Sequence, residues 1–297
     1  MTDILTIHTQ ELGKSYGNVE AVRGLSLAVA PGRITGFLGR NGAGKSTTIK
    51  MLLGMIRPSS GEGTVLGMRI TDPNQSVELR RRVAYVSEDK RLYGYMTVGQ
   101  ILRFTSVLFP DWRSEVAEQL LREYELPMNR KIKALSKGMR TKLALLLALA
   151  RKPELLILDE PSEGLDPVGV EQLLQSLIAQ SAEGTAVFFS SHQISEVERI
   201  ADHVCMLEKG RLVLDVSLDE MRQSYRQIDC VFPALPAERE FQIAGVESVR
   251  AKGLQLSIFT NGNTEAIVER ARDLHASSIQ VAPVGLREMF LEKVKEN

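Results

Sequence analysis

At residues 39–47 the chain reads Gly39-Arg40-Asn41-Gly42-Ala43-Gly44-Lys45-Ser46-Thr47. The first eight residues fit the pattern Gly-x-x-x-x-Gly-Lys-Ser/Thr, whose glycines let backbone N–H groups turn towards phosphate oxygens. In such a loop the lysine reaches the β- and γ-phosphates of a nucleotide, and the hydroxyl of Ser46 faces a magnesium ion. We therefore predict that this stretch binds ATP together with Mg²⁺.

The residues on either side of the loop support this prediction. Residues 32–38 are typical of a short buried strand, and residues 45–55 place Ile49, Leu52 and Leu53 at helical spacing. A strand, a glycine-rich turn and a helix form the context that a phosphate loop requires. The start of the helix adds its positive dipole end to the site. A chance match to the pattern in a chain of this length occurs in about one case per hundred, and this context makes it rarer.

Two acidic residues follow a second apolar run. Residues 155–158 read Leu-Leu-Ile-Leu, and Asp159 and Glu160 come directly after them. Strands that are buried on both faces of a parallel sheet have this composition. Both carboxylates should therefore lie at the carboxyl edge of the sheet, where open α/β folds bind ligands. We predict that Asp159 is a magnesium partner and that Glu160 polarises the attacking water. The alternative is an acid pair at the start of a helix before Pro161.

The alternation of strands and helices predicts the fold class. Further strands are expected at residues 83–86 and 186–189, with mostly helical sequence at about 90–140. We expect an α/β protein: a P-loop NTPase core with a mostly parallel sheet and a helical subdomain at 90–140, within a domain of residues 1–225. Residues 226–297 are expected to form a small α+β appendage. Its predicted elements are strands at 246–250, 254–260 and 278–282 and helices at 264–274 and 286–294.

Composition excludes several classes of protein. Lysine plus arginine equals aspartate plus glutamate, at 37 each, so the net charge predicts no nucleic-acid partner. The two cysteines, Cys205 and Cys230, lack the spacing of a zinc site or a disulfide framework, which is typical of a cytoplasmic protein. The longest apolar run, residues 143–150, is shorter than the roughly 20 residues of a membrane span. We therefore expect other subunits to supply any passage through a membrane.

Residues 135–139 carry a resemblance to a known family. They read Leu135-Ser136-Lys137-Gly138-Met139, where Ser136 is a candidate helix N-cap and Gly138 leaves the backbone bare. The segment resembles the signature of the ATP-binding cassette (ABC) transporters, most often Leu-Ser-Gly-Gly-Gln, in a form frequent in bacterial exporter-type cassettes. The resemblance covers about residues 4–220. It implies that residues 136–139 bind the γ-phosphate of ATP held by a second cassette, in a homodimer or a paralogous heterodimer.

Three more residues match positions of this family, and a fourth, Glu88, departs from its pattern. The resemblance implies that Asp166 lies in the loop crossing the cassette interface, that His192 is a catalytic switch histidine at the γ-phosphate, and that Tyr16 stacks on adenine. Glu88 stands where the family usually has a glutamine, and it is a third candidate magnesium ligand beside Ser46 and Asp159. The alternatives are an ordinary turn aspartate at 166, a packing tyrosine at 16 and a solvated loop carboxylate at 88.

The resemblance implies a function. The chain would be the ATPase subunit of an ABC transporter, located in the cytoplasm on the inner face of the cell membrane. ATP-driven closure of two cassettes would move separate transmembrane permease subunits, in the direction of export, and the segment from Glu88 to Thr97 would be the docking surface. The rival classes are a soluble cassette ATPase acting on nucleic acid or ribosomes, and a P-loop kinase or GTPase. The signature segment argues against the kinase and the GTPase.

Overall fold

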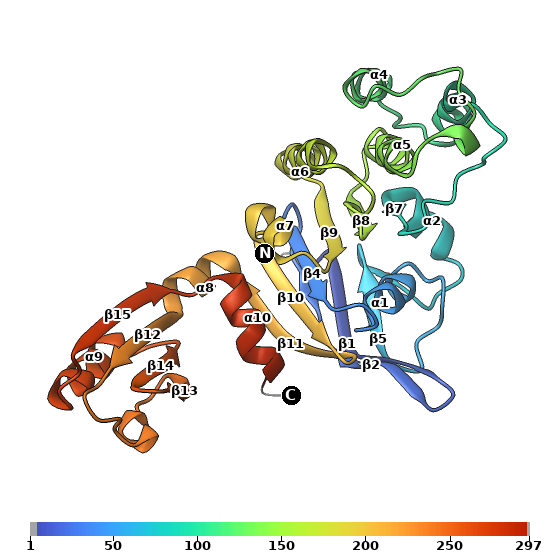
Figure 1. Ribbon diagram of the computed structural model, residues 1–297. Helices are drawn as coiled ribbons and strands as arrows, with labels where there is room; N and C mark the ends of the chain where they lie inside the picture. The colour runs from blue at the N-terminus through green and yellow to red at the C-terminus, as the bar shows by residue number, and fades with distance from the viewer. Residues whose placement is uncertain (1–4, 296–297) are drawn as a thin grey trace. The chain divides into compact units, whose positions relative to one another are not determined.

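The computed structural model describes residues 5–295, and the chain divides into two compact units between Asp215 and Val216. Figure 1 shows the two units, with the first coloured from blue to yellow and the second from orange to red. Each unit has its own sheet or sheets and its own buried core. None of the helices in the described part of the chain has the length and apolar character that crossing a bilayer requires.

A six-stranded sheet organises the first unit, in the order β11-β10-β4-β9-β8-β7. The four pairings from β10 to β7 are parallel, and every residue of β4, β8 and β9 is buried. Burial on both faces explains the continuous apolar runs in the sequence, and it confirms the predicted α/β core with a mostly parallel sheet. The strands are β4 (Ile34–Gly39), β7 (Val83–Val86), β8 (Leu155–Asp159), β9 (Ala186–Ser191), β10 (His203–Glu208) and β11 (Arg211–Ser217).

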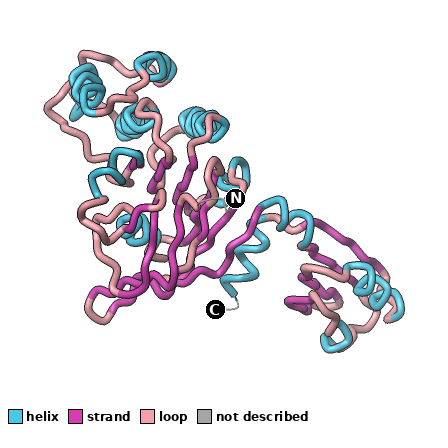
Figure 2. The backbone as a smooth tube through the Cα atoms, turned by 180° about the vertical axis from the view of Figure 1, so that it is seen from behind, coloured by secondary structure: helices cyan, strands magenta, loops and turns pink. Residues whose placement is uncertain are grey.

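Both faces of this sheet are covered. On one face Phe37 and Ile157 pack into a core cluster that also includes Ile49 of α1 (Lys45–Leu52). On the other face the helices α6 (Pro167–Ala182) and α7 (Ile194–Ile200) pack against β4 and β9. The contact with α7 requires a glycine at residue 36, because a Cβ there would lie 2.3 Å from Cγ1 of Val197. Seen from behind, the strands of the first unit lie between its helices (Figure 2).

A second sheet of the first unit was not predicted. It runs in the order β2-β1-β5-β6, with β3 paired to β1, and the pairings are antiparallel. Its strand β1 mixes buried and exposed residues and carries register shifts, so the sequence shows no clean alternation. The strands are β1 (Ile7–Tyr16), β2 (Val19–Leu25), β3 (Ala28–Val29), β5 (Ser60–Val65) and β6 (Met68–Arg69).

Three helices form the helical part predicted near residues 90–140. They are α3 (Val98–Leu108), α4 (Ser114–Glu123) and α5 (Lys137–Leu149), and both α3 and α4 contact α5. A capping box between Thr97 and Gln100 starts α3, and the helix ends before Pro110. The shorter helix α2 (Ser76–Arg82) leads into β7. The helix α1 ends at Leu52, three residues before the predicted end, because the chain turns at Gly54 with a φ of 63°.

The second unit is a small α+β fold. After α8 (Leu218–Ser224) it forms one antiparallel sheet in the order β13-β14-β12-β15. In chain order this is strand, short 3-10 helix, strand, strand, helix, strand, which is a ferredoxin-like arrangement with its first helix shortened. Strand β12 was not predicted. The elements are β12 (Arg226–Val231), η2 (Glu238–Phe241), β13 (Val246–Lys252), β14 (Gln255–Thr260), α9 (Thr264–Asp273), β15 (Ser278–Pro283) and α10 (Leu286–Lys295).

Candidate active site

The predicted phosphate loop joins β4 to α1. Gly44 is the N-cap of α1 with a φ of 110°, and a Cβ there would lie 2.4 Å from the carbonyl oxygen of Ala21. At Gly39 a Cβ would lie 2.6 Å from the carbonyl oxygen of Leu207. Both positions therefore require glycine. No side chain among the described residues caps α1, so the first N–H groups of this helix are left for a ligand.

The loop borders a cavity of about 370 Å³, a size that suits a small molecule. Of the predicted site residues, the loop residues other than Gly39 and Ala43 line it, together with Glu88 and the predicted base Glu160. Asp159 is only 2 % exposed and lies directly before Glu160. The residues that line the cavity are Ala21, Arg40, Asn41, Gly42, Gly44, Lys45, Ser46, Thr47, Glu88 and Glu160.

Lys45 and Glu160 form a buried ion pair at this cavity. The ammonium of Lys45 lies 3.0 Å from Oε1 of Glu160 and donates a hydrogen bond of 2.7 Å to the carbonyl oxygen of Gly39. The two side chains are 6 % and 9 % exposed. A buried pair costs desolvation energy, and either partner left alone would be an uncompensated charge. A phosphate group that binds to Lys45 must therefore compete with the carboxylate of Glu160.

Glu160 has a strained backbone that its neighbours hold in place. Its φ is 47°, a left-handed conformation that costs of order 1 kcal/mol for a residue with a side chain. Its N–H donates to Oγ of Ser190 at 3.0 Å, and its carbonyl oxygen accepts from Nζ of Lys90 at 3.0 Å. Its Oε2 lies 2.8 Å from Nδ1 of His192. This backbone conformation and these contacts hold the carboxylate between Lys45 and His192, where the sequence predicts the hydrolytic chemistry.

Sequence reasoning missed two residues that position this carboxylate, namely Ser190 and Lys90. The hydroxyl of Ser190 also donates to Oδ1 of Asp159 at 2.7 Å, so one side chain fixes both acidic residues. Lys90 is 6 % exposed, and burial lowers the pKa of its ammonium. Ser190 does stand at the end of an apolar strand two residues before His192, which is a signal that could have been used. Nothing near Lys90 in the sequence predicts a buried lysine.

The signature residues and Asp166 lie outside the lining of this cavity. Ser136 caps α5, and its Oγ accepts a hydrogen bond of 3.1 Å from the N–H of Met139. Lys137 forms an ion pair of 2.6 Å with Glu163, and a Cβ on Gly138 would lie 3.0 Å from the carbonyl oxygen of Gly164. The signature therefore packs against the loop that leads to Asp166. Asp166 caps α6 by accepting from the N–H of Gly169 at 2.7 Å.

The two remaining predicted residues are exposed. Tyr16, at the end of β1, is 51 % exposed, is not among the lining residues, and carries the ammonium of Lys14 5.2 Å from its ring centroid. A ring with a free face is what stacking on adenine requires. Glu88 lies exposed at the cavity, close in sequence to the buried Lys90. The donors available to a cation here are hydroxyl and carboxylate oxygens, which fit Mg²⁺.

Glu88→Gln is expected to leave ATP affinity within about twofold and to raise the Mg²⁺ concentration for half-maximal hydrolysis several-fold, because an amide oxygen binds Mg²⁺ more weakly than a carboxylate. The measurement is a Mg²⁺ titration of phosphate release at constant ATP. The matched control is Asp89→Asn, which removes the neighbouring exposed carboxylate that lies outside the cavity lining. If the two variants titrate alike, Glu88 is an ordinary solvated carboxylate.

Known proteins of one family resemble this chain. A family model described as ABC transporter matches residues 22–163. An uncharacterized ABC transporter ATP-binding protein of Nostoc sp. is 38 % identical, over 72 % of this chain and 67 % of its own length. The bacitracin transport ATP-binding protein BcrA of Bacillus licheniformis is 35 % identical, over 74 % of this chain and 72 % of its own. A solved structure of an ATP-binding subunit of an ABC transporter superposes with a TM-score of 0.67 at 31 % identity, and it covers 74 % of this chain and 92 % of its own.

Proposed function

Because the chain belongs to the ABC transporter family, as one of its ATP-binding subunits, we propose that it hydrolyses ATP at the cavity beside residues 39–47 and thereby drives separate membrane subunits. One observation carries the proposal. A lysine of the phosphate loop, a buried glutamate and a histidine meet there, with Glu160 lying 3.0 Å from Lys45 and 2.8 Å from His192. These are a cation for phosphate, a base for water and a partner for that base.

Each side chain has a distinct task in this proposal. Lys45 exchanges the carboxylate of Glu160 for the β- and γ-phosphates of ATP. Ser46 and Asp159, with Glu88, would hold Mg²⁺, which neutralises charge on the phosphates when it is bound. Glu160 is then released to accept a proton from the attacking water, and His192 orients its carboxylate and contacts the γ-phosphate. Tyr16 would stack on the adenine ring.

We also propose that a second cassette completes each site. Ser136–Met139 and Asp166 do not line the cavity of their own chain, although the family resemblance assigns them to the γ-phosphate and the interface. A homodimer or a paralogous heterodimer would bring the signature of one cassette to the phosphate loop of the other. Closure would then require ATP, because its γ-phosphate would be bound by both chains.

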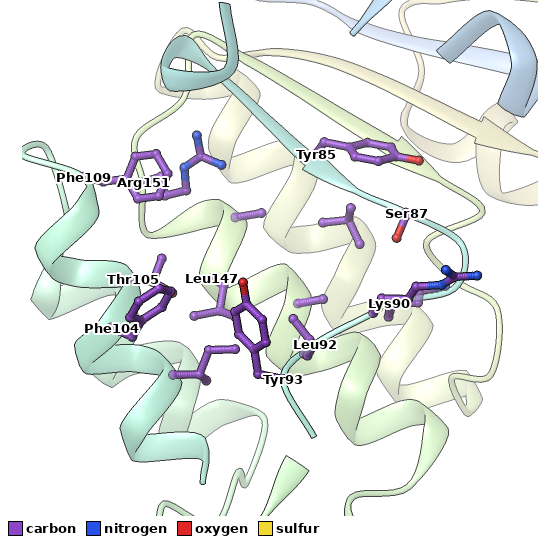
Figure 3. Close-up of a pocket in the computed structure, with 15 residues that line it drawn as sticks. Tyr85, Ser87, Lys90, Leu92, Tyr93, Phe104, Thr105, Phe109, Leu147 and Arg151 are labelled. Carbon is purple, nitrogen blue, oxygen red and sulfur yellow. The ribbon is translucent and has the colours of Figure 1, made fainter. Parts of the chain in front are cut away.

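A second cavity supports docking of a membrane subunit. It has a volume of about 360 Å³ and is bordered by the end of β7, α3 and α5 (Figure 3). Tyr93 and Phe104 are 52 % and 44 % exposed, and their rings meet edge-on at 6.0 Å. Exposed aromatic side chains around a cavity are typical of an interaction site. We propose that a short cytoplasmic helix of the permease, with apolar side chains, packs here.

This docking surface is connected to the ATP site along the chain. Lys90 and Tyr93 border the docking cavity, whereas Glu88 borders the ATP cavity, so one short loop serves both. A displacement of Glu88 on nucleotide binding would therefore move the residues that contact the permease.

We propose that the transport driven by this chain is export, because residues 135–139 resemble exporter-type signatures. We also propose that the chain lies on the cytoplasmic face of the membrane. The second unit, from Val216, we propose to be a separate domain.

Lys45→Ala is the variant that tests the nucleotide site directly. It removes a charge-assisted contact to the phosphates and leaves the buried carboxylate of Glu160 without its cation, so ATP affinity should fall by about 10- to 100-fold. The measurement is an equilibrium titration with a fluorescent ATP analogue, paired with phosphate release in the presence of Mg²⁺. The control is Lys50→Ala, which removes an exposed lysine from the same helix. Equal affinities for the wild type and Lys45→Ala would exclude the loop as the binding site.

A further inference from the structure

Three side chains with metal-binding atoms meet on β10 and β11, the two neighbouring strands at one edge of the central sheet. His203 and Cys205 stand two residues apart on β10 and point to the same face, and Asp215 reaches them from β11. Nε2 of His203 lies 2.5 Å from Oδ1 of Asp215, and Sγ of Cys205 lies 3.3 Å from the same oxygen. One ligand atom from each residue lies within 4.8 Å of the other two.

This cluster is separate from the ATP site. The parallel register pairs His203 with Thr35 and Cys205 with Phe37, whereas the phosphate loop begins at Gly39, at the end of β4. Two to four residues of a strand correspond to about 7–13 Å. None of the three residues lines the ATP cavity or the docking cavity. The cluster therefore has no part in the proposed hydrolysis.

We propose that His203, Cys205 and Asp215 bind one Zn²⁺ ion. A thiolate, an imidazole and a carboxylate are the ligand types that Zn²⁺ takes in proteins, whereas Mg²⁺ and Ca²⁺ prefer oxygen alone. The Mg²⁺ that accompanies ATP would therefore not compete for this site. With three protein ligands, a water molecule completes the tetrahedron.

The distances suit a single ion after a small adjustment. Zinc bonds of about 2.0–2.3 Å in a tetrahedron place the ligand atoms about 3.3–3.6 Å apart. The separation of 3.3 Å between Cys205 and Asp215 already fits, and the 2.5 Å between His203 and Asp215 must widen by about 1 Å. The side chains of His203 and Asp215 are 31 % and 39 % exposed, so both have room to rotate and the ion can enter from solvent.

The alternative is that the three residues form only a hydrogen-bonded network. Burial, together with the carboxylate of Asp215, raises the pKa of the Cys205 thiol, which donates its proton to that carboxylate in the absence of metal. Zinc would displace this proton and the hydrogen bond between His203 and Asp215. The sequence predicted no zinc site because it has no closely spaced cysteine pair. The fold instead joins Cys205 and Asp215 across two neighbouring strands.

Zinc at this position would have a structural consequence. Asp215 is the last residue of the first unit, and the second unit begins at Val216. An ion shared by β10 and β11 would cross-link the two strands one residue before that boundary. It would therefore stabilise the first unit against unfolding.

The test uses Co²⁺ as a spectroscopic probe, with the full untagged chain after treatment with a chelator and without nucleotide. The wild type should bind one equivalent of Co²⁺ with thiolate-to-metal charge-transfer absorption in the near ultraviolet, and one equivalent of Zn²⁺ should displace it and raise the melting temperature. Cys205→Ser should abolish this absorption. Asp215→Asn and His203→Gln should each weaken Zn²⁺ binding by at least about 10-fold. Cys230→Ser, which alters the other buried cysteine, is the matched control and should behave as the wild type.

Two outcomes would overturn the proposal of a zinc site. Absence of the charge-transfer absorption in the wild type would show that the three residues form a hydrogen-bonded network and no metal site. If Cys205→Ser fails to fold, the variants at the two partly exposed residues test the proposal instead. Unchanged Zn²⁺ affinity in both Asp215→Asn and His203→Gln would overturn it. Neither result bears on ATP binding, because the two sites share no residue.

Discussion

Glu160→Gln is expected to lower the rate of ATP hydrolysis by at least about 100-fold, the effect of removing a general base. ATP should still bind, because Lys45 and Ser46 are unchanged. The geometry predicts that affinity stays equal or rises, since the phosphates no longer compete with a carboxylate for the ammonium 3.0 Å away. The amide can still meet Lys45 and His192, so the local fold should persist. Phosphate release at saturating ATP and a titration with a fluorescent ATP analogue measure the two effects separately.

The matched control is Glu171→Gln, which removes an exposed carboxylate on α6 that pairs with Arg199 outside the cavity. It should hydrolyse ATP at the rate of the wild type. Near-normal turnover in Glu160→Gln would remove this residue from the role of base. A loss of ATP binding in Glu160→Gln would instead show that the buried pair with Lys45 is needed to shape the loop.

Ser136→Arg is expected to lower the rate of ATP hydrolysis by about 100-fold as well. Ser136 nevertheless lies outside the lining of the cavity beside residues 39–47 of its own chain. In the proposed two-cassette site the variant would place bulk and charge against the γ-phosphate held by the partner cassette, whereas ATP binding to the isolated chain should not change. Ser114→Arg, which adds the same side chain at the exposed start of α4, is the control and should remain active. Equal activity of the two variants would show that Ser136 is only a helix cap.

Mixing Ser136→Arg with Lys45→Ala extends this prediction. In a mixed dimer the first chain supplies an intact phosphate loop and the second an intact signature, so one of the two sites is whole. If the sites act independently, an equal mixture should recover about a quarter of wild-type activity, because half the dimers are mixed and each has one working site. If both sites must act together, mixing restores no activity, yet the mixed dimer should still form with ATP.

The parts of the fold that the sequence predicted are those with strong local patterns. Strands β4, β7, β8 and β9 are short apolar runs because helices or a second sheet cover both of their faces. Helices α3 and α5 begin at capping residues, Thr97 and Ser136. The antiparallel strands β1 and β5 were missed, since their residues are partly exposed and β1 carries irregular register. Their pairing depends on contacts between distant segments, which periodicity does not show.

In the candidate site, too, the sequence predicted the local motifs and missed the contacts between distant residues. The glycine loop and the acidic pair after β8 are local motifs, and the structure places the loop, Glu88 and Glu160 around one cavity. The buried pair of Lys45 and Glu160, and the support from Ser190 and Lys90, join residues that are far apart in the chain. The zinc ligands proposed at residues 203, 205 and 215 are a further case, because their spacing matches no motif.

The proposed closure of two cassettes around ATP is tested most directly by the mass of Glu160→Gln in solution. Each chain has a mass of 33.0 kDa. Light scattering should report twice that mass with ATP and Mg²⁺, and a single chain without nucleotide or when Ser136→Arg is added to the same chain. The wild type should also hydrolyse ATP faster per mole as its concentration rises. A mass of one chain at saturating ATP, together with wild-type turnover that is independent of protein concentration, would contradict the account and leave a site that works within one cassette.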